Sequence, residues 1–143
     1  MATSNAKNNG LKILIFRQNK HLHQAFNELE KEGRKVSHWA WWAFPTERPG
    51  YSEPLTTLKD TPKGKSFITK QTAQQLISEA PEIWKQVLSK ICYLLNQQKS
   101  SSLSPILPKI DHDRVRYFVK FWKSINDKPE WFNSVINTLS KNM

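Results

Sequence analysis

The chain of 143 residues has a hydrophobic share of 38% and six tryptophans, which suffices for one core and excludes a disordered chain. Its single cysteine excludes an internal disulfide and favours a reducing compartment. The formal net charge of +10 favours polyanionic partners, of which nucleic acid is the obvious candidate. We therefore expect one basic globular domain in the cytoplasm, with the nucleus or a virion as alternatives.

The first residues of the chain, 1–10, are small and polar and have nothing to bury, so we expect a flexible arm there. The remainder, 11–143, is then a single helical domain. The apolar run within 11–16 is too short for a signal-peptide core or a membrane span, and it fits either a short strand or the beginning of a helix. From Leu22 the apolar residues recur at i, i+4 and i+7, which predicts an amphipathic helix that Gly33 caps.

An aromatic segment and a proline-rich stretch follow. Ser37 can cap a short helix over 38–44, and Pro45 should end it, because the residue before a proline disfavours helical geometry. The stretch 45–66 holds four prolines and two glycines without sustained periodicity, which predicts a long ordered loop over the surface. Such loops often carry functional sites in compact domains.

Four further helices are expected from apolar positions that repeat at three and four residues. Their start signals are Thr69 or Thr72, Pro81, Asp111 or Asp113, and Pro129. Cys92 falls in the apolar stripe of the second of these helices, so we expect it in the core. The composition of 97–108 is typical of a linker. The sequence thus predicts an all-α fold, a single compact domain of about five to seven helices with a long ordered loop after the aromatic segment.

Residues 33–52, GRKVSHWAWWAFPTERPGYS, resemble the signature of a bacterial family catalogued as domain of unknown function 1810, sometimes labelled calpastatin. That family typically reads G-x-K-x-S-H-W-x-W-aromatic-x-F-P. The matching positions are Gly33, Lys35, Ser37, His38, Trp39, Trp41, Phe44, Pro45 and Gly50. The resemblance implies an all-helical, single-domain fold and no settled activity. The chain departs from the family at Tyr117, Phe118 and Lys120, where small hydroxyl residues would fall, so the resemblance implies no shared pocket there.

The leading functional hypothesis is a cleft between the His38 helix and the following loop. An imidazole beside tryptophans can act as a general base or hold a phosphate, although a packed structural histidine fits the same pattern. We expect the cleft to bind a small phosphate-bearing or nucleotide-like anion, and hydrolysis there would use His38 or Glu47 as the base. The expected ligand-binding residues are Lys35, Trp39, Trp42, Thr46, Arg48 and Tyr51.

The alternative hypothesis is a nucleic-acid-associated protein that contacts backbone phosphates through a basic surface. Its expected contacts are Lys7, Lys12, Arg17, Arg116, Lys120 and Lys123. A third interpretation is a protein-interaction module that uses exposed aromatic side chains.

Neither a cofactor nor a metal site is expected. The acidic residues at 111–113 are interpreted as helix caps, and His21 and His23 do not face each other on a helix. The sequence shows no phosphate-binding glycine loop, zinc-ligand spacing, serine elbow or kinase signature. Familiar catalytic classes are therefore unsupported, and whether the protein is an enzyme stays open.

Overall fold

The computed structural model describes residues 2–47 and 68–143, which form six α-helices and no strand. The helices are α1 (Ala2–Glu32), α2 (Ala40–Ala43), α3 (Ala73–Glu79), α4 (Glu82–Gln97), α5 (His112–Lys123) and α6 (Glu130–Lys141). A short 3-10 turn, Lys109–Asp111, precedes α5. The prediction of an all-α single domain is therefore confirmed. No helix in the described ranges has the length and apolar character needed to cross a membrane.

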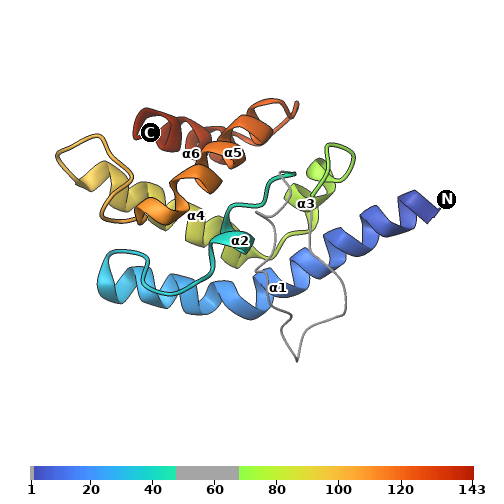
Figure 1. Ribbon diagram of the computed structural model, residues 1–143, viewed down its shortest axis with the longest axis horizontal. Helices are drawn as coiled ribbons and strands as arrows, with labels where there is room; N and C mark the ends of the chain where they lie inside the picture. Colours follow the sequence, from blue (N-terminus) through green and yellow to red (C-terminus); the bar gives the residue numbers. More distant parts are fainter. Residues whose placement is uncertain (1, 48–67) are drawn as a thin grey trace.

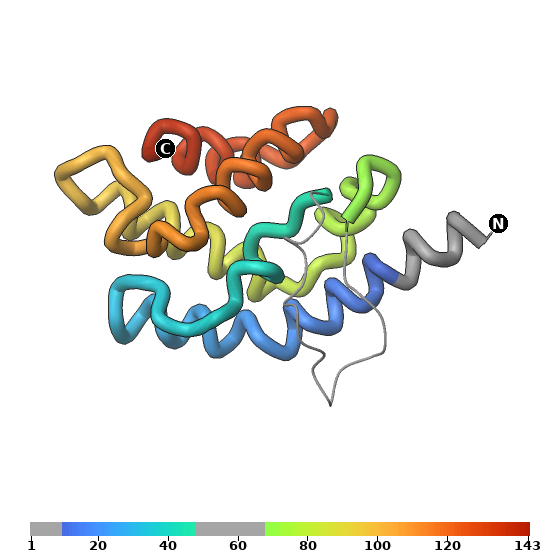
Figure 2. The backbone as a smooth tube through the Cα atoms, viewed as in Figure 1, coloured from blue at the N-terminus to red at the C-terminus, as the bar shows by residue number. Residues whose placement is uncertain are grey.

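The helices pack in layers around α4. Helix α1 runs along one side of the molecule, α5 and α6 lie on the opposite side, and α4 contacts both α1 and α6 (Figure 1). The segment 33–47 turns back along α1 and then crosses towards α5, as Figure 2 shows. This path carries the aromatic motif from α1 to the other side of the molecule.

An aromatic cluster between α4, α5 and α6 forms the centre of the core. The rings of Trp84, Trp122 and Phe132 have centroids 4.8 to 6.1 Å apart, within the usual range for packed aromatic pairs. Each buried indole also donates to the motif segment: Trp84 Nε1 to the carbonyl of Ala43 and Trp122 Nε1 to that of Pro45, both at 2.9 Å. The core therefore fixes the backbone of the motif through hydrogen bonds as well as by packing.

The N-terminal half of α1 differs from one of the two expected conformations. Residues 11–16 are helical, and the strand alternative is wrong. Helix α1 also includes residues 2–10. The flexibility that we expect for residues 1–10 stays a prediction. Gly33 ends the helix as expected: its φ is +68°, in the left-handed region that glycine adopts without strain, and its N–H donates to the carbonyl of Leu29 at 3.0 Å.

The residues predicted to cap the helices were a poorer guide to the structure than the spacing of the apolar residues. Ser37 does not cap α2, because its hydroxyl donates to Glu28 instead. Thr72 and Asp111 immediately precede α3 and α5, but neither side chain makes a capping hydrogen bond. Pro81 lies directly before α4, and α2 ends before Pro45, as expected.

Residues 98–108 connect α4 to the 3-10 turn, in keeping with the linker composition of 97–108, and three apolar residues of this segment are buried in the core: Leu103, Ile106 and Leu107. The carbonyl of Ile106 also accepts the backbone N–H of Lys35 at 2.8 Å. The segment therefore packs against the start of the motif. Most of the predicted loop over 45–66 lies outside the described residues.

Candidate functional site

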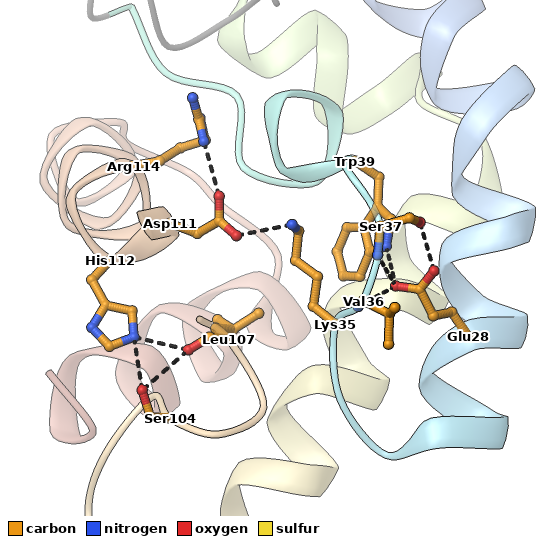
Figure 3. A network of polar contacts seen from close by, with 10 residues as sticks. All are labelled: Glu28, Lys35, Val36, Ser37, Trp39, Ser104, Leu107, Asp111, His112 and Arg114. Atoms are coloured by element: carbon orange, nitrogen blue, oxygen red, sulfur yellow. Dashed lines mark hydrogen bonds and ion pairs between the residues drawn. The ribbon is translucent and has the colours of Figure 1, made fainter. Parts of the chain in front are cut away.

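The motif segment is held to α1 by one carboxylate. Glu28 accepts hydrogen bonds from the backbone N–H groups of Val36 and Ser37, from the Ser37 hydroxyl at 2.6 Å and from Trp39 Nε1 at 3.0 Å (Figure 3). Burial of Glu28 by itself raises its pKa, but these hydrogen bonds outweigh burial, so the pKa of Glu28 is lowered. Glu28 therefore fixes the entry of the motif in its ionised form.

A buried ion-pair cluster joins the start of the motif to α5. Lys35 Nζ lies 2.9 Å from one oxygen of Asp111, and Arg114 Nη1 lies 3.1 Å from the other (Figure 3). Lys35 and Asp111 are both buried, so each needs the other to offset its lost hydration. Asp111 thus acts as a bridge between segments, which explains why it does not cap α5.

The tryptophans of the motif divide between the core and the surface. Trp39 and Trp42 are 2% and 3% exposed, so the expectation that either stacks on a surface ligand finds no support. Trp41 is half-buried, with the Arg114 guanidinium 5.2 Å from its ring centroid. His38 is exposed, and its ring centroid lies 6.3 Å from that of Trp41, so it is not enclosed by aromatic walls.

A small pocket of about 130 Å³ lies beside His38. Its lining residues are Lys35, His38, Ala40, Trp41, Ile110, Asp111 and Arg114. The volume falls below the range of roughly 300–1,000 Å³ that is typical of small-molecule sites. Both of its permanent cations, Lys35 and Arg114, already pair with Asp111. The small pocket is thus poorly suited to the predicted ligand.

A large pocket of about 460 Å³ lies at the other end of the motif. The described residues that line it are Thr46, Glu47, Lys70, Tyr117, Lys120, Phe121 and Ser124. The end of the motif forms one wall, the segment before α3 forms the second, and one face of α5 forms the third. Thr46 is buried and its hydroxyl lies 3.4 Å from the carbonyl oxygen of Tyr117, which brings the first wall against the third.

The cations of the small pocket are paired with Asp111, whereas the charged side chains of the large pocket have no ion-pair partner in the described part of the chain. Glu47, Lys70 and Lys120 are exposed, and within the described part of the chain none of them makes an ion pair or a hydrogen bond. Two ammonium groups and one carboxylate are therefore available to a ligand. The pocket lies directly after the aromatic motif, as the predicted cleft did, but its cations come from elsewhere in the chain.

A family model described as "Protein of unknown function (DUF1810)" matches residues 8–142. The chain belongs to this family. No curated protein and no solved structure matches it. The resemblance of the motif to this family is confirmed, and membership of DUF1810 defines no reaction or ligand.

The other candidate ligand-binding residues of this DUF1810 chain lie in different places. Lys35 is buried in its pair with Asp111, whereas Thr46 and Glu47 line the large pocket. Arg48 and Tyr51 lie outside the described residues. The structure thus separates His38 from Glu47, the two candidate bases, into different pockets.

The candidate nucleic-acid contacts are also divided. Arg17 is 3% exposed, and burial lowers the pKa of its guanidinium, so it does not belong to a basic surface. The side chain of Lys7 lies outside the described part. Exposed positions are occupied by Lys12, Arg116, Lys120 and Lys123, and Arg116 pairs with Asp113 at 2.9 Å.

Two side-chain groups outside these two pockets, the Ser104–His112 pair and the Cys92 thiol, are held by their surroundings in unreactive states. His112 Nε2 lies 2.9 Å from the carbonyl of Leu107, so it donates there and cannot also accept the proton of Ser104, 3.4 Å away (Figure 3). Burial raises the pKa of Cys92 to about 12, as expected for a core thiol. Among the described residues no group of three or more histidine, cysteine or acidic side chains is placed to hold a metal.

Sequence reasoning overlooked most of the large pocket. Its α5 wall consists of Tyr117, Lys120, Phe121 and Ser124, at i, i+3, i+4 and i+7, which is one helical face. This spacing is present in the sequence, but the apolar stripe of the same helix is the stronger pattern. Lys70 carries no sequence signal, because only the fold brings it opposite α5.

Proposed function

We propose that the protein binds a small phosphate-bearing anion in the large pocket. The observation that carries the proposal is the pair Lys70 and Lys120, which line the pocket from two different segments without an ion-pair partner in the described chain. Charge-assisted hydrogen bonds from ammonium groups to phosphate oxygens are among the strongest polar contacts. The pocket volume of about 460 Å³ also suits a ligand of nucleotide size.

The surroundings of the two lysines bear on the same ligand class. The hydroxyl groups of Thr46 and Ser124 line the pocket but donate to the carbonyls of Tyr117 and Phe121 at 3.4 and 2.6 Å, so phosphate binding falls to the ammonium groups. The net charge of +10 adds long-range attraction for an anion. If the bound ligand is hydrolysed, Glu47 is the candidate base that lines this pocket, since His38 lines the small one.

Thermal unfolding with inorganic pyrophosphate tests the proposal. A ligand at 100 times its dissociation constant stabilises the fold by about 2.7 kcal/mol, which is readily measured. We expect this stabilisation to weaken less steeply with rising salt than binding of an oligonucleotide would, and to be lost in Lys70→Ala and Lys120→Ala. Lys123→Ala is the matched control, because Lys123 is exposed on the same helix but does not line the pocket.

The nucleic-acid alternative is favoured by one observation, the exposed basic row of Arg116, Lys120 and Lys123 on α5. It predicts stabilisation by oligonucleotides that fades steeply as salt rises. It also predicts that Lys120→Ala and Lys123→Ala weaken binding equally. This result, with no effect of pyrophosphate, would contradict the anion-pocket proposal.

A further inference from the structure

Ile110 is the most exposed large hydrophobic side chain in the described part of the chain, with 84% of its surface accessible. It lies in the 3-10 turn that precedes α5, and the next residue of that turn, Asp111, is buried. A single exposed isoleucine needs no explanation. Ile110 is not isolated, however, because it lines the small pocket together with Ala40 and Trp41. The small pocket therefore has an apolar lining that is open to solvent.

The walls of the small pocket are fixed by contacts with one another and with the core. Asp111 pairs with Lys35 at 2.9 Å and with Arg114 at 3.1 Å (Figure 3). The Arg114 guanidinium lies 5.2 Å from the ring centroid of Trp41, and the backbone N–H of Lys35 donates to the carbonyl of Ile106 at 2.8 Å. The pocket is thus formed before anything binds, which lowers the entropy cost of docking a partner.

The size and lining of the small pocket suit one aliphatic side chain. Its volume of about 130 Å³ is close to that of a protein cavity of about 150 Å³ that accepts benzene. A charged side chain gains little there, because the ammonium, guanidinium and carboxylate groups of the lining already pair with one another. An aliphatic side chain needs no polar partner, and it loses contact with water when it packs against Ala40, Trp41 and Ile110.

The surroundings of the small pocket are cationic. The two segments that border it, 31–35 and 109–116, carry six lysine and arginine residues against three aspartate and glutamate residues, a formal charge of +3. Arg34 and Lys109 are exposed next to the lining residues Lys35 and Ile110, and within the described residues neither side chain makes an ion pair. Acidic residues beside an aliphatic anchor complement this surface in charge. A nucleic acid would match the charge but would leave the apolar lining uncovered.

We infer that the small pocket is a docking site for an acidic peptide segment of a partner protein, which places one leucine, isoleucine or valine side chain against Trp41 and Ile110. The carboxylates next to this anchor pair with Arg34 and Lys109. The small pocket shares no lining residue with the large one, so this inference does not depend on the anion proposal.

Selection of random heptapeptides displayed on phage against the full chain tests the inference. We expect the enriched peptides to share one aliphatic residue with aspartate or glutamate next to it. The enriched peptide, labelled with fluorescein, should then bind about tenfold or more weakly to Ile110→Ser in fluorescence polarisation, because apolar contact with the anchor is lost. Ile110 is 84% exposed, so this variant keeps the core. Tyr93→Ser is the matched control, because Tyr93 is 56% exposed on α4 and does not line the pocket.

A second pair of variants tests the charge argument. Arg34→Glu with Lys109→Glu should weaken binding of the enriched peptide about tenfold or more at low salt, and the loss should shrink as salt screens the charges. Lys12→Glu with Lys123→Glu makes the same change in net charge at exposed positions that do not line the pocket, and it should weaken binding much less.

Several results would overturn the inference. Selection could yield no consensus, or a consensus that lacks acidic residues, or peptides that bind Ile110→Ser as tightly as the wild type. Binding of an oligonucleotide that is lost in Ile110→Ser would also overturn it, since the surface would then serve nucleic acid. None of these results bears on the binding of pyrophosphate in the large pocket, so failure of this inference is distinct from failure of the anion proposal.

Discussion

Replacing Glu28 by alanine removes the acceptor of four hydrogen bonds that hold the motif segment to α1. The backbone N–H groups of Val36 and Ser37 are near the surface, so water can replace the carboxylate there. Trp39 Nε1 belongs to a residue that is 2% exposed, and leaving this donor unsatisfied costs about 1–3 kcal/mol. We expect Glu28→Ala to lower the free energy of unfolding by about 2–3 kcal/mol in total.

The isosteric variant Glu28→Gln separates geometry from charge. The amide oxygen of glutamine can accept the bonds from Val36, Ser37 and Trp39 that reach one carboxylate oxygen, and the rotatable Ser37 hydroxyl can accept from the amide nitrogen. Only charge assistance is lost. We expect Glu28→Gln to cost about 1 kcal/mol, clearly less than the alanine variant.

The charge of Glu28 also predicts a pH dependence. Its pKa in the folded protein is lowered from 4.5, so the folded state prefers the ionised form more than the unfolded state does. The resulting stabilisation is fully present above pH 4.5 and is lost as the pH falls through the folded pKa. Glu28→Gln, which cannot ionise, should lose less stability over this acid range than the wild type.

Urea unfolding followed by tryptophan fluorescence measures both effects, at neutral pH and at steps down to about pH 3. At neutral pH the alanine variant should also melt roughly 7–10 °C lower. Glu32→Ala is the matched control, because Glu32 is exposed near the end of the same helix, and it should change stability by less than about 0.5 kcal/mol. Equal losses in Glu28→Ala and Glu32→Ala would refute the reasoning.

Two further predictions follow from buried groups. Asp111→Ala leaves Lys35 buried without its carboxylate and should lower the free energy of unfolding, measured with urea, by about 3–5 kcal/mol. The double variant Lys35→Met with Asp111→Ala should lower it less. Equal losses in the two variants would contradict a buried ion pair. Cys92, whose pKa burial raises to about 12, should not react with a thiol reagent at pH near 8 until urea unfolds the chain, and rapid labelling of the native protein would contradict its burial.

Periodic apolar spacing predicted the long helices because it reports which face of a helix is buried. The stripe of α4 and the glycine at the end of α1 depend on neighbouring residues alone. Polar signals failed where a distant partner competes for the same group. Ser37 and Asp111 both fit helix caps locally, yet Glu28 binds the first and Lys35 the second, and neither partner is apparent from the sequence.

The candidate site shows the same limit. The sequence predicted a cleft beside the motif, and Thr46 and Glu47 line a pocket at the end of the motif. It expected Trp39 or Trp42 to stack on a ligand, but both are buried and the more accessible tryptophan of the motif is Trp41. Which face of a four-residue helix turns inwards depends on the segments packed around it.

These positions suggest what the aromatic motif contributes to function. Its indoles of Trp39 and Trp42 are buried, and two core tryptophans outside it, Trp84 and Trp122, donate to the carbonyls of Ala43 and Pro45. Those two bonds fix the backbone immediately before Thr46 and Glu47, at the edge of the large pocket. The motif is then a rigid support for the residues that follow it. A ligand bound in the large pocket should therefore also bind more weakly in Trp122→Phe, which removes the Nε1–H donor to the carbonyl of Pro45, although that indole lies outside the pocket lining.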